Sequence, residues 1–142
     1  MEGLNIEALR KMCELNVIRP LVERSRSGKG AHVWIFFKKA IPAATARNFG
    51  FLLLDKGSTS INLKSFHYYD RMYPSQDVAS SIGNLIALPL QGQALKNGNS
   101  AFVDENWNRK YQKKTSINFF YILINYMISS PTWKRKNFLT AL

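Results

Sequence analysis

A basic, glycine-containing segment is the part of the sequence best equipped for chemistry. It reads Arg24-Ser25-Arg26-Ser27-Gly28-Lys29-Gly30 and precedes an apolar run from Ala31 to Phe37. Glycines let a backbone approach a ligand closely, and consecutive N–H groups can form an anion-binding nest. The segment therefore predicts a phosphate-binding loop formed by Arg26, Ser27, Gly28, Lys29 and Gly30, although its spacing is not that of a Walker A loop. The alternative is a solvated hairpin without a ligand.

His32 follows this loop on a predicted strand, where it could either contact the same ligand or bond to backbone groups inside the core. The chain has one other histidine, His67, and a single cysteine, Cys13. These residues are too few for a Cys/His zinc site, and one cysteine cannot form an internal disulfide. Any metal chemistry must therefore rely on carboxylates.

The charge of the chain favours polyanionic partners. Its 142 residues carry a formal net charge of +11, which suits nucleic acid, nucleotide phosphates or an anionic membrane surface. Up to Glu105 there are 13 basic and 9 acidic residues, whereas residues 106–142 contain 7 basic residues and no acidic ones. This shift in composition indicates a divergent, basic and apolar tail, and we expect its boundary between residues 1–107 and 108–142, where the four sequence blocks described below end.

The tail contains the most apolar run of the chain, residues 117–128, between two clusters of basic residues. A spanning helix needs about 20 apolar residues, so this shorter run with two asparagines predicts no membrane span. A buried helix or strand is the favoured interpretation, and a segment on a membrane surface is the alternative. The N-terminus lacks the basic and apolar regions of a secretion signal, which predicts a cytoplasmic protein.

The hydrophobic pattern predicts an α+β fold. Apolar residues recur at helical spacing in two segments, and Pro42 suits the first turn of the second helix. Between them lies a β-branched and aromatic segment, typical of a strand, which places His32 and Trp34 on one face. In chain order we expect a helix over 5–16, an extended segment over 17–23, a strand over 31–37, a helix over 42–54, a strand over 84–90 and its hairpin partner over 101–104.

Four sequence blocks, in the same order, resemble the primase domain of TOTE conflict systems, a branch of the archaeo-eukaryotic primases. They read Ser-Arg-Ser-Gly-Lys-Gly-Ala-His-Val-Trp-Ile-Phe-Phe at 25–37, Tyr-Asp-Arg-Met-Tyr-Pro-Ser-Gln-Asp at 69–77, Gly-Asn-Leu-Ile-Ala-Leu-Pro-Leu-Gln at 83–91 and Gly-Asn-Ser-Ala-Phe-Val-Asp-Glu-Asn at 98–106. The first block resembles the family's second catalytic motif, a serine and a histidine that run into a strand.

The resemblance implies a primase-polymerase that transfers nucleotidyl groups from nucleoside triphosphates to a strand growing on a nucleic acid template. It implies Mg²⁺ or Mn²⁺ held by carboxylates, and helicase or nuclease modules of the same system as further partners. The phosphate-contacting histidine corresponds to His32, with Ser27 and Lys29 beside it. The metal-binding aspartate of the third motif corresponds to Asp77, and Asp104 is the competing assignment.

The sequence departs from the family at its first motif, a paired Asp-x-Asp on a strand before the first helix. No aspartate precedes Asp55. We therefore expect a partial RRM-like catalytic core without its first strand, which is inactive as it stands. Two hypotheses follow: a nucleotidyltransferase component whose missing carboxylates come from elsewhere, or a non-catalytic remnant that binds nucleic acid or nucleotides.

The resemblance also predicts a geometry. The His32 side chain should point into the same cavity as Ser27 and Lys29. Asp77 should lie on the same side of the sheet as His32, with Asp104 farther away on a hairpin.

Overall fold

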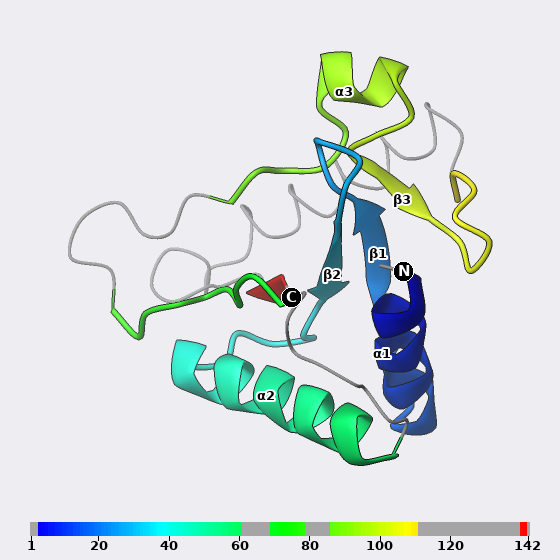
Figure 1. The fold of residues 1–142 in the computed structure, drawn as a ribbon. Helices are drawn as coiled ribbons and strands as arrows, with labels where there is room; N and C mark the ends of the chain where they lie inside the picture. The colour runs from blue at the N-terminus through cyan, green and yellow to red at the C-terminus, as the bar shows by residue number, and fades with distance from the viewer. Residues whose placement is uncertain (1–2, 61–68, 79–85, 111–139, 142) are drawn as a thin grey trace.

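Helices and a small antiparallel sheet form the structure, a computed structural model that describes residues 3–60, 69–78, 86–110 and 140–141 (Figure 1). In chain order the elements are α1 (Gly3–Leu15), β1 (Leu21–Arg24), β2 (Ala31–Ile35), α2 (Ala43–Ser60), α3 (Gly92–Lys96), β3 (Ala101–Val103) and β4 (Thr140–Ala141). This combination confirms the predicted α+β class.

The sheet has the strand order β3-β1-β2-β4, and all neighbouring strands are antiparallel. β1 and β2 form a hairpin in which Glu23 is paired with His32. On the other side of β1, Phe102 of β3 is also paired with Glu23. Because directly paired residues point to the same face of a sheet, Glu23, His32 and Phe102 share one face.

Helices α1 and α2 pack against the opposite face of the sheet. Apolar residues of the two helices and of all three longer strands meet there, namely Leu9, Met12, Cys13, Val22, Val33, Ile35, Leu53 and Val103. Cys13 is fully buried in this layer. Burial, assisted by the nearby charge of Glu14, raises the pKa of its thiol to about 11, so the thiol stays protonated near neutral pH.

The face that carries Glu23 and His32 is covered differently. Trp34 and Phe102 form its buried apolar floor, and partly buried residues of two irregular segments pack on them, including Tyr73 and Leu90. Trp34 is stacked on Phe36, with ring centroids 6.4 Å apart. A face covered by irregular segments rather than by helices leaves room for polar side chains near its centre.

Both predicted helices are confirmed, although α2 continues to Ser60, and the strand predicted over 31–37 is confirmed over Ala31–Ile35. The extended segment predicted over 17–23 begins only at Leu21, since a turn that includes an Ile18 N–H to Cys13 carbonyl bond ends α1.

The predicted hairpin between 84–90 and 101–104 is wrong. Residues 84–85 lie outside the described residues, 86–90 form no strand, and residues 101–103 pair with β1 instead. The reason is local: Pro89 has no N–H to donate, and Leu90 adopts a left-handed φ of 66°. A 2.6 Å bond from the Leu90 N–H to the Ser100 carbonyl links the two segments at their ends.

The apolar run at 117–128 also lies outside the described residues. Within the part of the chain that is described, no helix is long and apolar enough to cross a membrane.

Arg10 ties α1 to the end of β3. Its side chain is buried, and its Nη2 donates to the carbonyl oxygens of Val103 at 3.1 Å and Asp104 at 3.0 Å. These two bonds link residues more than 90 positions apart and fix β3 relative to the helix layer. Arg10 therefore helps to keep β3 beside β1, next to Glu23.

We expect Arg10→Met to lower the free energy of unfolding by about 1–3 kcal/mol, because the buried carbonyl of Val103 and the part-buried carbonyl of Asp104 lose their donor while helix propensity hardly changes. Urea unfolding measures this loss. Lys11→Met, at an exposed position of the same helix, is the matched control and should change stability by less than about 0.5 kcal/mol. Equal losses in the two variants would contradict a special role for Arg10.

Candidate functional site

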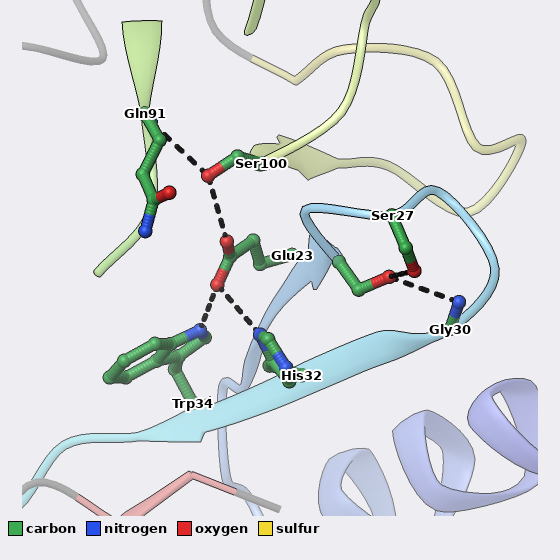
Figure 2. A network of polar contacts seen from close by, with 8 residues as sticks. Glu23, Ser27, Gly30, His32, Trp34, Gln91 and Ser100 are labelled. Atoms are coloured by element: carbon green, nitrogen blue, oxygen red, sulfur yellow. Dashed lines mark hydrogen bonds and ion pairs between the residues drawn. The ribbon is translucent and has the colours of Figure 1, made fainter. Parts of the chain in front are cut away.

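A buried carboxylate lies at the centre of the sheet face opposite the helices. Glu23 Oε2 accepts hydrogen bonds from Trp34 Nε1 at 2.9 Å and His32 Nδ1 at 3.2 Å (Figure 2). Its other oxygen, Oε1, accepts a 3.2 Å bond from Ser100 Oγ, which in turn accepts a bond from the backbone N–H of Gln91. The strand pairing explains this convergence, since His32 lies directly opposite Glu23.

The cost of burying this carboxylate is offset by its three donors. Glu23 is only 1% exposed, and a buried charge is strongly destabilising unless it is hydrogen-bonded and paired. Trp34 and Ser100 are neutral, so His32 is the group among these donors that can carry a compensating positive charge. Glu23 and His32 therefore form a potential ion pair on the sheet face.

The environment favours the protonated form of His32. The hydrogen bond to Glu23 raises the pKa of its imidazole, burial opposes this effect, and the negative charges of Glu23 and Asp70 raise the pKa further. The side chain remains 38% exposed, so part of the ring is accessible to a ligand. A partly exposed imidazolium of this kind can donate a charge-assisted hydrogen bond to an anion.

The loop between β1 and β2 is closed by its own hydrogen bonds. The Gly28 N–H donates to the Ser25 carbonyl at 3.0 Å, while the N–H groups of Lys29 and Gly30 donate to the hydroxyls of Ser27 and Ser25 at 3.3 and 3.1 Å. Three of the backbone donors expected to form an anion nest, those of Gly28, Lys29 and Gly30, are therefore occupied by oxygens of the loop itself.

The loop and the Glu23 network form two separate sets of contacts. Figure 2 shows His32 bonded towards Glu23, whereas Ser27 and Gly30 belong to a cluster within the loop. Arg26 and Lys29 are exposed and present their charges to solvent. The shared cavity predicted for His32, Ser27 and Lys29 stays a prediction, as do the phosphate contacts of the loop residues.

Gly28 and Gly30 have different roles in this loop. Gly28 has a φ of +77°, and a Cβ placed on it would lie 2.7 Å from Asn99 Oδ1 in the segment between α3 and β3. A Cβ on Gly30 would meet only Ser25 Oγ, at an ordinary distance of 3.9 Å. Of these two glycines, therefore, only Gly28 lies close to the chain before β3.

The two candidate metal ligands have local partners. Asp77 is 61% exposed and forms an ion pair with Arg47 of α2, which also donates to the Pro74 carbonyl at 3.1 Å. Asp104 Oδ1 accepts the backbone N–H groups of Asn106 and Asn108 at 2.9 and 2.8 Å, which closes the turn after β3. The metal role of Asp77 stays a prediction.

Sequence reasoning missed Glu23, Ser100 and Asp70. Asp70, rather than Asp77 or Asp104, is the aspartate whose charge acts on His32. Glu23 could have been found from the hairpin, because a six-residue loop over 25–30 pairs Glu23 with His32. No comparable sequence signal identifies Ser100, which reaches Glu23 across 77 positions of the chain.

Gly28→Ala should lower the free energy of unfolding by roughly 1–2 kcal/mol or more, because alanine is strained at positive φ and its Cβ would collide with Asn99. Gly30→Ala is the matched control, two residues away in the same loop, and should be close to neutral. Thermal or urea unfolding of both variants checks this difference. Equal stability of the two variants would refute the assigned packing of the loop tip.

The comparisons with known proteins point to one family. A search of curated proteins and a search of solved structures found no match to the sequence. A model of the archaeo-eukaryotic primase domain of TOTE conflict systems matches residues 3–118, which is most of the chain. The chain therefore belongs to the archaeo-eukaryotic primase domain family of TOTE conflict systems.

Proposed function

We propose that this chain is a primase-polymerase domain, of the class that transfers nucleotidyl groups from nucleoside triphosphates to a DNA or RNA strand growing on a template, that it is inactive as it stands, and that its His32 contacts the triphosphate. Family membership supports the reaction class. The observation that carries the assignment is the environment of His32. Its imidazole is partly exposed, and its surroundings favour the charged form. It also follows directly after a loop in which Arg26 and Lys29 are exposed.

The loop can take part in phosphate binding if phosphate oxygens replace the serine oxygens that now accept its backbone N–H groups. The hydroxyls of Ser25 and Ser27 accept the N–H groups of Gly30 and Lys29. A phosphate oxygen is a stronger acceptor than a neutral hydroxyl, so it can replace the serine oxygens at these donors. Arg26 and Lys29 would then add positive charge from the loop surface.

An RRM-like arrangement for this catalytic core is part of the proposal. The supporting observations are the order helix, antiparallel hairpin, helix, and the packing of α1 and α2 on a single face of the sheet. In such a core the ligand would approach the other face. Glu23 and His32 lie on that face.

Nucleotidyl transfer requires Mg²⁺ or Mn²⁺, which would activate the attacking hydroxyl and stabilise the leaving pyrophosphate. The described residues do not fit such a centre: they contain no group of three histidine, cysteine or acidic side chains that could hold a metal ion. Asp77 offers one carboxylate, and Arg47 already neutralises it. We therefore assign to this part of the chain the binding of nucleotide and derive no metal-dependent step from it.

The proposed partners are nucleic acid, nucleoside triphosphates and helicase or nuclease modules of the same system, in the cytoplasm. The net charge of +11 supports a polyanionic partner. A second candidate function is non-catalytic binding of nucleic acid or nucleotides. The absence of an Asp-x-Asp pair from all 142 residues favours it.

We expect His32→Ala to weaken ATP binding by about tenfold, because the substitution removes a charge-assisted hydrogen bond from a partly solvated site. The domain should fold with reduced stability, since Glu23 loses its charged partner but keeps the donors Trp34 and Ser100. Isothermal titration calorimetry measures the affinity, and circular dichroism checks the fold. Lys39→Ala, an exposed cation beyond the other end of β2, is the charge-matched control and should bind ATP like the parent chain.

We also expect the purified 142-residue chain to make no primers. Two divalent cations repel each other strongly at a separation of a few Å, and holding both requires several carboxylate oxygens in place beforehand. A primer-synthesis assay with single-stranded template, nucleoside triphosphates and Mg²⁺ or Mn²⁺ tests this expectation. Synthesis that is lost in His32→Ala would exclude the non-catalytic alternative and establish the enzyme.

A further inference from the structure

Glu23 is held in a single orientation by groups that come from different parts of the chain. Trp34 of β2 bonds to one carboxylate oxygen and Ser100, just before β3, bonds to the other. Both donors are themselves buried, and Ser100 is fixed further by the Gln91 N–H. The carboxylate can therefore neither rotate nor move towards solvent without breaking bonds in the core.

This fixed carboxylate determines which edge of His32 is available. Its Oε2 lies 3.2 Å from Nδ1 of the ring, so Nδ1 is occupied. The two nitrogens of an imidazole point in divergent directions, and a hydrogen bond at one of them sets the state of the other. Nε2 is left as the nitrogen that can meet a ligand at the partly exposed side of the ring.

We propose that Glu23 is a positioning residue for nucleotide binding: its buried carboxylate holds His32 by Nδ1, so that Nε2–H is directed at a phosphate group of the triphosphate. This inference rests on the proposed function of His32. It adds a residue that does not touch the nucleotide, and it gives the site a defined dependence on pH.

The charges around His32 set the direction of that dependence. Among the described residues, Glu23 of β1 and Asp70 of the 69–78 segment are the acidic groups whose charges act on the ring, and both raise its pKa. Asp70 is exposed and paired with Arg71, whereas Glu23 is buried against the ring. Glu23 is therefore the main reason why His32 stays protonated to higher pH and keeps a positive N–H for the phosphate.

Glu23→Gln separates charge from position. The glutamine Oε1 can accept from His32 and Trp34 as Oε2 of the glutamate does, and its amide can donate to the Ser100 hydroxyl. The ring should keep its place while its pKa falls. Asp70→Asn is the matched control, since it removes the other acidic charge that raises the pKa of the same histidine and should lower that pKa less.

The test combines two measurements on the full chain. NMR titration of the imidazole signals, assigned with His32→Ala, gives the pKa of His32 in each protein. Calorimetric titration with ATP, and with inorganic triphosphate, gives the affinity between about pH 5.5 and 8.5, around the ordinary pKa of histidine. Comparing variants at the same pH cancels the titration of the ligand itself.

We expect Glu23→Gln to bind like the parent chain at the acidic end and more weakly above neutral pH. If the protonated ring is the binding form, the loss at high pH is about tenfold for each unit by which the pKa falls. Above neutral pH, the affinity of Asp70→Asn should lie between that of the parent chain and that of Glu23→Gln. Inorganic triphosphate should follow the same profile, since the contact is made with phosphate rather than with the base.

Two results separate this inference from the proposed function. If His32→Ala weakens binding but Glu23→Gln leaves the pH profile and the pKa of His32 unchanged, Glu23 does not position the histidine and the inference fails alone. If His32→Ala binds ATP as well as the parent chain, both fail. Should Glu23→Gln not fold, the parent chain still decides: a His32 pKa at or below its ordinary value of 6.5 would overturn the inference.

Discussion

The surrounding structure must satisfy the charge and the hydrogen bonds of one buried carboxylate. Glu23 lies in the central strand and is 1% exposed, so its charge must be satisfied by groups within the protein. The hairpin partner supplies His32 and Trp34, and the chain before β3 supplies Ser100. A slip of β1 against β2 by one residue would turn Glu23 towards the helix layer, so the polar network and the strand register depend on each other.

The need to satisfy Glu23 links the stability of the sheet to the proposed ligand contact of His32. A neutral partner would satisfy the hydrogen bonds of Glu23, but a histidine can also balance its charge and still present its second nitrogen outwards. His32 does both, because it is paired with Glu23 in the sheet and is 38% exposed. This arrangement underlies the proposed contact of His32 with a triphosphate, beside a loop in which the N–H groups of Lys29 and Gly30 bond to serine oxygens.

The three aspartates Asp70, Asp77 and Asp104 are engaged in contacts of their own. Asp77 balances Arg47, Asp104 closes the turn after β3, and Asp70 is paired with Arg71. Ligation of a metal ion would require such carboxylates to give up these partners and to converge. The contacts of these residues therefore support nucleotide binding by the described part of the chain more directly than metal-dependent transfer.

The sequence by itself determined the family, the α+β class, both long helices and the strand that carries His32, because these depend on local motifs and on hydrophobic periodicity. It did not determine the partner of residues 101–103, since several extended segments compete for the edge of β1 and the irregular backbone at Pro89 and Leu90 decides between them. Nor did it identify Glu23 as the centre of the site. The hairpin alone pairs Glu23 with His32, but the rest of the network arises only in the tertiary structure. Trp34 and Ser100, separated by 66 positions in the sequence, are brought to the same carboxylate by the packing of three strands.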